Sequence, residues 1–215
     1  QNRIRGPQAV KIGPDGRLYV VSEENGRILR YDARTLAYID TFITTGAGFN
    51  ATGIAFGPDG DVYLGGYASD TVRRYDGTTG AFEATVVAAR AAGLNGPDNG
   101  LTFGPDGRLY IPAYDSNSVA VYDPASGTTS AFIAPSSGGL SQTRGILFEA
   151  NGNVLVSGEG SNAILRYGPG GNFIGTFVTG LTGPTGLTRT ADGRILVANN
   201  ANGAEFIAAD GTRIG

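Results

Sequence analysis

Short runs of consecutive hydrophobic residues recur along this chain at nearly regular intervals. They are Leu18-Tyr19-Val20-Val21, Val62-Tyr63-Leu64, Leu109-Tyr110-Ile111, Val154-Leu155-Val156 and Ile195-Leu196-Val197. Because successive side chains of a β-strand point to opposite faces, such a run predicts a strand that is buried on both faces. A two-sheet sandwich would instead leave one face of each strand polar. The pattern therefore favours sheets that are stacked between neighbouring sheets.

A turn sequence precedes each apolar run. It reads Gly-Pro-Asp-Gly at 13–16, 57–60 and 104–107, and it is degenerate at 149–152 and 190–193. Proline presets the first turn dihedral, aspartate favours the next position, and glycine accepts a positive φ, so this sequence predicts a hairpin. The final glycines, Gly16, Gly60, Gly107, Gly152 and Gly193, are 44, 47, 45 and 41 residues apart. A period of this length with strands on both sides of each turn is typical of a β-propeller.

Each period reads as four short strands, which in the second period span 52–56, 61–67, 71–76 and 81–87. The third strands carry one column of aromatic residues, Tyr31, Tyr75, Tyr122 and Tyr167, and the fourth strands carry Phe42, Phe132 and Phe177. Columns this regular predict core packing. Asp70, Asn117, Asn162 and Asn202 form a further column that suits turn positions with positive φ.

We therefore predict an all-β, single-domain, five-bladed propeller with four antiparallel strands per blade. The blades span about 6–45, 46–92, 93–137, 138–179 and 180–215 plus 1–5. Residues 6–10 align with 183–187, and 211–215 align with 171–175, so the two ends are complementary in phase. The simplest interpretation is a ring closed by both termini in the last blade. Five blades of a longer array, or an edge strand completed by a neighbouring molecule, have the same phasing.

Composition narrows the function. The 215 residues carry 40 % hydrophobic and 16 % charged residues and a net charge of −3, with no Cys, His, Met or Trp. Disulfides, thiolate metal sites and histidine catalysis are excluded. Without a basic stripe or a long apolar run, we expect no nucleic acid partner and no membrane span. The chain begins at Gln1, which favours a trimmed, exported product, so we expect a secreted, periplasmic or cell-surface location.

Candidate binding positions are the residues that differ between blades while the framework repeats. In a propeller the first strand of each blade lines the central channel, and its starting positions are Gln8, Thr52, Asn99, Arg144 and Thr185, with Asp98 beside Asn99. The loop after each second strand should open at the same end. It carries Glu23, Tyr67, Tyr114, Asp115, Glu159 and Asn200. These carboxylates and phenols could hold a small polar ligand such as a sugar, or a cation. Drift at unconstrained positions and a merely solvated rim would produce the same pattern.

The repeat Gly-(Ile/Leu)-x-Phe-Gly-Pro-Asp-Gly-x-Leu-Tyr-Val, followed by Arg-Tyr-Asp-x-x-Thr-Gly, resembles NHL-repeat propellers over essentially the whole chain. It is more loosely similar to the gluconolactonase-like and streptogramin-lyase-like propellers. Such families usually close six blades, and this chain offers five. The resemblance to gluconolactonases implies a channel metal, but only Asn99, in Pro97-Asp98-Asn99-Gly100-Leu101, matches their ligand pattern. The streptogramin lyases rely on a histidine, and this chain has none.

The sequence thus predicts a non-catalytic binding or assembly module outside the cytoplasm, with a protein or small polar ligand at the channel mouth or at the blade edges. One alternative is a divalent-metal hydrolase of the lactonase type, with Glu23, Asn99 and Glu159 as weak metal candidates. A second alternative is a repeating subunit of a surface layer or filament, since a homo-oligomer could form through the incomplete edge strand. No cofactor is predicted, although Ca²⁺ would fit the oxygen-rich rim.

Overall fold

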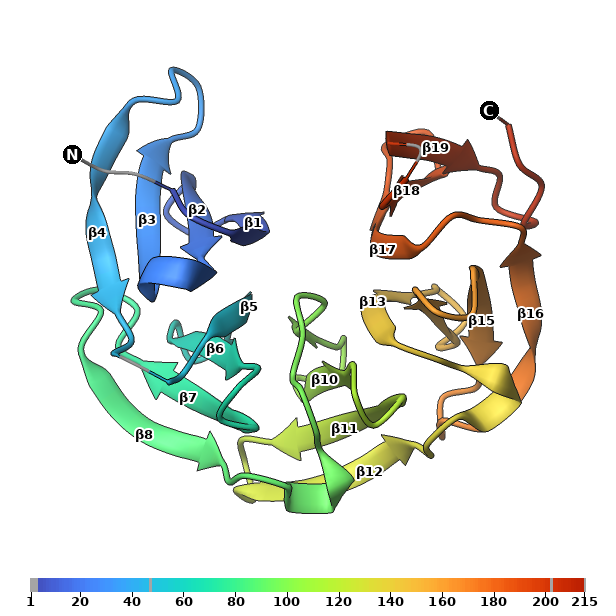
Figure 1. The fold of residues 1–215 in the computed structure, drawn as a ribbon, viewed down its shortest axis with the longest axis horizontal. Coiled ribbons are helices and arrows are strands. Elements are labelled where there is room, and N and C mark those ends of the chain that lie inside the picture. The colour runs from blue at the N-terminus through green and yellow to red at the C-terminus, as the bar shows by residue number, and fades with distance from the viewer. Residues whose placement is uncertain (1–3, 47, 202, 215) are drawn as a thin grey trace.

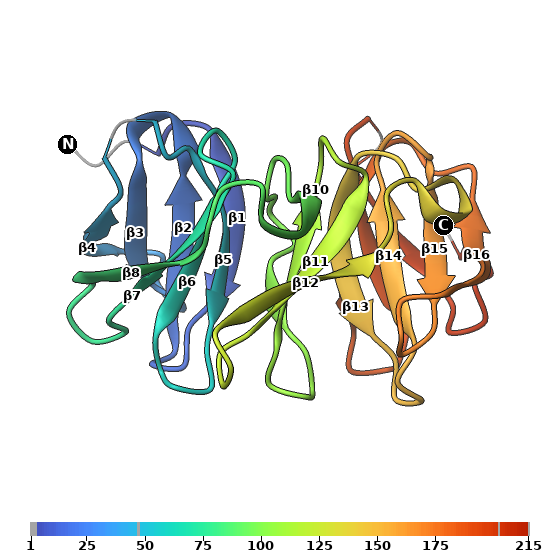
Figure 2. The ribbon, with the colours of Figure 1, turned by 90° about the horizontal axis from the view of Figure 1, so that it is seen from below.

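Five radial β-sheets form a propeller in the computed structural model, which describes residues 4–46, 48–201 and 203–214 (Figure 1). Seen from its edge the molecule is a flat disc, with most strands running from one face to the other (Figure 2). The five-bladed all-β prediction is confirmed. Helical structure in the described residues is limited to the single turns η1 (Glu23–Asn25), η2 (Ala91–Gly93) and η3 (Ser137–Gly139).

Each blade is built from strands that are consecutive in the chain. The first blade contains β1 (Pro7–Ile12), β2 (Arg17–Ser22), β3 (Arg27–Asp32) and β4 (Tyr38–Thr44). The second contains β5 (Ala51–Phe56), β6 (Val62–Gly66), β7 (Thr71–Tyr75) and β8 (Phe82–Val87). The third contains β9 (Thr102–Phe103), β10 (Leu109–Ala113), β11 (Ser118–Asp123) and β12 (Thr128–Ile133). The fourth contains β13 (Thr143–Phe148), β14 (Val154–Gly158), β15 (Ala163–Tyr167) and β16 (Phe173–Thr179), and the fifth contains β17 (Pro184–Arg189), β18 (Ile195–Asn199) and β19 (Gly203–Ile207). Each sheet lies within one of the five ranges expected from the repeat.

The aspartate of the Gly-Pro-Asp-Gly turn joins the hairpin to the core. In the second blade Asp59 accepts a hydrogen bond from the Asp61 amide at 3.1 Å and another from the Tyr63 hydroxyl at 2.6 Å. Gly60, the last turn residue, has a φ of 89°, a conformation that glycine adopts without steric cost. The equivalent tyrosines of the first and third blades bond their turn aspartates in the same way. One carboxylate therefore orders the turn and anchors a core ring.

Aromatic contacts connect one blade to the next. The Tyr63 ring lies 5.1 Å from that of Phe103 in the third blade, in an edge-to-face arrangement. Tyr19 makes the same contact with Phe56, and Tyr110 with Phe148. These three tyrosines belong to the second strands, whose central residues are buried on both faces as the apolar runs predict. In the third-strand column Tyr75, Tyr122 and Tyr167 are buried, whereas Tyr31 of the first blade is only half-buried.

The predicted turn column also joins neighbouring blades. Asp70, Asn117 and Asn162 have φ values of 54°, 52° and 51°. Their side-chain oxygens accept hydrogen bonds from backbone amides that belong to the next blade, at Gly96, Gln142 and Gly183 respectively. Asn202, the fourth predicted member, lies outside the described residues. These side chains therefore stabilise both their own turn and the contact between blades.

The fifth blade differs from the prediction of a ring closed by both termini. It has three strands in the described part of the chain, extended only by an isolated bridge between Ile207 and Arg213. Residues 1–3 lie outside the described residues. Residues 4 and 5 form no strand, and the Arg5 amide donates to Ser22 Oγ of the first blade at 2.8 Å. Those two residues are therefore held by the first blade, and the predicted pairing of residues 1–3 with the fifth blade lies outside the described residues.

The first and fifth blades lie on the two sides of an opening in the arc (Figure 1). Val10 and Ile12 of β1 are each 57 % exposed, whereas Ile54, Leu101 and Ile146, which are equivalent to Val10 in the next three blades, are buried. The second to fifth blades have a glycine near the start of the inner strand, and the surroundings of these glycines show the same asymmetry. The inner-strand glycines of the second, third and fourth blades press against backbone carbonyls of the following blade, whereas Gly186 of the fifth blade has only the Ala198 Cβ nearby, at 4.0 Å.

Replacing Gly100 by alanine is expected to destabilise the protein, because the added Cβ would overlap the Arg144 carbonyl oxygen of the next blade. Overpacking of this kind costs about 1–3 kcal/mol, and here the obstacle is backbone that cannot rotate away. Gly186→Ala is the matched control at the equivalent position of the fifth blade, and it should change stability by less than about 0.5 kcal/mol. Denaturant unfolding followed by circular dichroism measures both. Equal losses in the two variants would contradict the explanation.

Candidate functional site at the channel mouth

Seven side chains from four blades line a cavity of about 180 Å³ at one end of the channel, which we call the mouth cavity. Antiparallel pairing places the start of each first strand beside the end of the second, as Ala51 pairs with Gly66 and Thr143 with Gly158. Strand starts and the loops after the second strands therefore share one end of the disc. The lining residues are Gln8, Glu23, Thr52, Tyr67, Asp98, Tyr114 and Arg144.

Arg144 is the electrostatic centre of the mouth cavity. Its Nη1 lies 2.8 Å from Asp98 Oδ2, and its Nε lies 2.6 Å from Glu159 Oε2. The guanidinium also lies 4.5 Å from the centre of the Tyr114 ring. Arginine suits this position because its planar fork of donors can serve two carboxylates while its face stacks on an aromatic ring.

The Asp98 carboxyl group is buried, since the residue is only 1 % exposed. Burial holds its pKa above the usual value, and the charge of Arg144 acts in the opposite direction. Burial alone would lower the pKa of Arg144, but attraction to Asp98 and Glu159 outweighs it and the pKa is raised. Asp98 also accepts the Asn99 amide at 2.6 Å. This bond and the ion pair hold a charge that would otherwise be costly to bury.

Two tyrosines form the aromatic side of the mouth cavity. The rings of Tyr67 and Tyr114 lie 6.3 Å apart with an interplanar angle of 62°. The Tyr67 hydroxyl donates to Asp115 Oδ1 at 3.0 Å. Burial, followed by this hydrogen bond, raises the pKa of Tyr67 to about 12, so its hydroxyl stays protonated at neutral pH. Both rings are only partly buried, so they can offer a face or a hydroxyl to a ligand.

Two lining residues have structural bonds of their own. Thr52 Oγ1 donates to the Pro97 carbonyl of the next blade at 2.7 Å and is buried. Gln8 Nε2 donates to Glu23 Oε2 at 2.6 Å. That bond orients the Glu23 carboxylate and leaves its other oxygen available as an acceptor.

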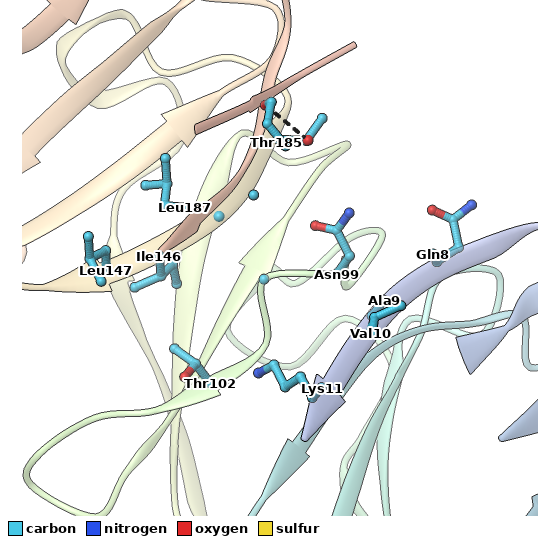
Figure 3. Close-up of a pocket in the computed structure, with 14 residues that line it drawn as sticks. Gln8, Ala9, Val10, Lys11, Asn99, Thr102, Ile146, Leu147, Thr185 and Leu187 are labelled. Carbon is cyan, nitrogen blue, oxygen red and sulfur yellow. Dashed lines mark hydrogen bonds between the residues drawn. The ribbon is translucent and has the colours of Figure 1, made fainter. Parts of the chain in front are cut away.

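The other predicted positions lie outside the lining of the mouth cavity. Glu159 and Asp115 adjoin it through Arg144 and Tyr67. Asn99 and Thr185 line a second, larger cavity in the central channel (Figure 3). Asn200 is exposed, and its amide donates to the Gly183 carbonyl at 3.0 Å. The mouth cavity therefore draws on the first four blades and not on the fifth.

The three weak metal candidates have separate surroundings. Glu23 accepts from Gln8, Glu159 is paired with Arg144, and Asn99 lines the central channel. In the described residues, the carboxylates that come within 4.8 Å of one another as a group of three are Asp61, Asp76 and Glu83. Arg74 forms ion pairs with Asp61 and Glu83 on that blade surface. A cation at Glu159 would have to displace Arg144, and Ca²⁺ binding at the rim stays a prediction.

Sequence reasoning missed Lys11 as a channel residue. The repeat pattern places the start of each inner strand at the channel, and Lys11 lies three residues after the starting position Gln8 on β1. Its side chain crosses to the third blade, where Nζ donates to the Leu101 carbonyl at 2.7 Å. Composition could have drawn attention to this residue, because Lys11 is the only lysine in a chain that carries 15 arginines.

No protein-family model matches this chain, and no curated protein matches its sequence. Solved structures do match its fold. A catalytically inactive virginiamycin B lyase from Staphylococcus aureus with quinupristin has a TM-score of 0.75 and 18 % identity, covering 99 % of this chain and 70 % of the lyase. A gluconolactonase from Xanthomonas campestris has a TM-score of 0.75 and 18 % identity, covering 97 % of this chain and 73 % of that enzyme.

A chain of a nidogen/laminin complex gives a TM-score of 0.80 at 16 % identity, covering 99 % of this chain and 80 % of that one. These neighbours include two kinds of enzyme and a protein of a binding complex. The similarity to gluconolactonase-like and streptogramin-lyase-like propellers is therefore confirmed as a similarity of fold. At these identities the fold carries no information on activity. No helix in the described residues is long and apolar enough to span a membrane.

Proposed function

We propose that this propeller is a non-catalytic binding module whose mouth cavity takes a small polyhydroxylated ligand of about monosaccharide size. The observation that carries the proposal is the convergence of unrepeated polar residues from four blades on one cavity. Its volume of about 180 Å³ is below the about 300–1,000 Å³ of sites for drug-sized ligands, which suits a single sugar ring.

The chemistry of the lining supports the same ligand class. The cavity offers hydrogen-bond acceptors, from the carboxylates of Glu23 and Asp98, and donors, from the guanidinium of Arg144. The hydroxyl groups of a ligand can bond to both kinds. The rings of Tyr67 and Tyr114 offer apolar faces on which the C–H face of a sugar can pack. The two acidic groups nearest Arg144 are already engaged by its guanidinium, which favours binding over acid–base chemistry on the ligand.

The test is calorimetric titration with a panel of monosaccharides and inositol at neutral pH. We expect at least one saturable ligand, and Tyr67→Ala should weaken its binding about tenfold by removing a stacking ring. Tyr38→Ala is the matched control, because Tyr38 is an exposed tyrosine on β4 and does not line the cavity. Failure of every sugar to saturate, or equal affinity in both variants, would contradict the proposal.

A hydrolase of the lactonase type is the alternative function, and an activity assay with a lactone substrate tests it. Lactone turnover with added Ca²⁺ that disappears in Glu23→Gln would replace the binding proposal with that activity. Self-association through the three-stranded fifth blade is a second candidate, favoured by the outer edge of β19, which Arg213 and Ile214 cover only in part in the described chain. A mass that rises with concentration in light scattering would support it, and a constant monomer mass would exclude it.

A further inference from the structure

The central channel contains a second cavity of about 460 Å³ beside the mouth cavity (Figure 3). Fourteen residues from the inner strands and adjoining backbone line it, and thirteen of them are uncharged. The remaining one is Lys11. Within the described residues Lys11 forms no ion pair, and its ammonium group is bonded to the Leu101 carbonyl. The cavity is thus an uncharged space with a single cationic side chain in its wall.

The wall of the cavity opposite Lys11 is formed by residues of the fourth and fifth blades. Figure 3 shows Lys11 directed toward Thr102, with Ile146, Leu147 and Leu187 on the far wall, while the Asn99 side chain points away from Lys11. A ligand that fits both sides has an anionic head and a short apolar body. The acidic residues Glu23 and Asp98 line the separate mouth cavity, so they do not neutralise this cation from within the channel.

A partly buried ammonium without a carboxylate partner is electrostatically unfavourable. Burial lowers the pKa of Lys11 to about 8. An anion placed beside it would restore the charged form, because opposite charges at close range stabilise each other strongly in a partly desolvated site. Anion binding and proton uptake at Lys11 are therefore linked.

We propose that the central channel is a binding site for a small amphipathic monocarboxylate, whose carboxylate pairs with Lys11 and whose apolar body packs against the half-buried Leu147 and Leu187. This site adjoins the sugar-sized mouth cavity of the proposed function, and Gln8 lines both cavities. Thr102 would supply an additional hydrogen-bonding group to the carboxylate end.

The single lysine makes the test direct. Protein labelled with ¹³C-lysine has one Lys side-chain resonance, and its titration from pH 6 to 11 reports the charge of Lys11 alone. We use benzoate as the probe and benzamide as its neutral isostere. The titration midpoint should rise by about one unit or more with benzoate and stay unchanged with benzamide. An unchanged titration midpoint in saturating benzoate would overturn the proposal. This measurement uses the parent protein and requires no variant.

Calorimetry at pH 7 supplies the second measurement. Lys11→Met should weaken benzoate binding about tenfold or more, as expected for the loss of a charge-assisted hydrogen bond, whereas Lys11→Arg should retain it. Equal affinity in Lys11→Met would assign Lys11 a structural role as a cap for the Leu101 carbonyl. Tyr67→Ala should leave benzoate binding intact, and Lys11→Met should leave sugar binding intact. Failure of one site is therefore distinguishable from failure of the other.

Discussion

Arg144→Met is expected to lower the free energy of unfolding by about 3–5 kcal/mol at neutral pH, the usual cost of removing one partner of a buried ion pair. The variant leaves Asp98 buried and ionised without its counter-ion, near the carboxylate of Glu159. It also removes the cation that stacks on Tyr114. Denaturant unfolding at pH 7 measures the loss.

The loss should depend on pH in a defined direction. Removing Arg144 takes away the charge and hydrogen bond that favour the ionised form of Asp98, while its burial and the nearby charge of Glu159 remain and only the Asn99 amide opposes them. The folded-state pKa of Asp98 therefore rises further above that of the unfolded chain. A group with a raised folded pKa contributes full stability below its unfolded pKa and loses it as the pH rises through the folded pKa. Arg144→Met should therefore be closest to the parent protein near pH 4 and furthest from it above pH 7.

Adding Asp98→Asn to Arg144→Met is the control, because the double variant has no unpaired charge at the buried position. It should recover most of the lost stability. If the double variant is as unstable as the single one, the cost comes from lost packing on Tyr114 and not from the charge of Asp98. That outcome would contradict the electrostatic account of the mouth cavity.

Tyr63→Ala is the second change with a large expected effect, again about 3–5 kcal/mol, as for other large aromatic truncations in cores. Tyr63 is fully buried, and its ring packs edge-to-face on Phe103 of the third blade. The variant therefore opens a cavity between two blades. Its loss of unfolding free energy, measured in urea, should greatly exceed that of Tyr63→Phe, which retains the ring. Near-equal losses in the two variants would contradict a packing role.

Tyr63→Phe isolates the hydroxyl group. Losing its bond to Asp59 should cost about 0.5–1.5 kcal/mol at neutral pH. Burial, followed by the bond to Asp59, raises the pKa of Tyr63, so the native state keeps a proton that the unfolded chain releases near pH 10. Stability from this group is present below pH 10 and falls as the pH rises above it. The difference in unfolding free energy between the parent protein and Tyr63→Phe should therefore shrink above pH 10. A difference that grows above pH 10 would contradict this direction of the pKa change.

Much of the candidate site could be predicted because its residues occupy the positions at which the repeats differ from one another. All seven residues that line the mouth cavity are positions at which the blades differ, and they lie at strand starts or in the loops after second strands. Their role in binding stays a prediction. The ion pairing of Arg144 with both Asp98 and Glu159 was not predictable, since the three residues come from two blades and their separation depends on how those blades pack. Lys11 was missed because its side chain extends from the first blade to the Leu101 carbonyl of the third, a contact that depends on how the blades are arranged.

The sequence by itself determined the order of strands and turns within a blade and the number of blades in this chain. Hairpin turns, strand periodicity and aromatic columns depend on neighbours within about 45 residues, and they repeat, so each copy supports the others. The tertiary structure alone decided how the arc ends. Phasing of the termini predicted a closed fifth blade, but closure depends on where the first and last blades lie relative to each other. In the structure Arg5 bonds the first blade, and Gly186 has no following blade against it. Contacts between chain ends are set by the accumulated rotation of five sheets, and no local pattern encodes that rotation.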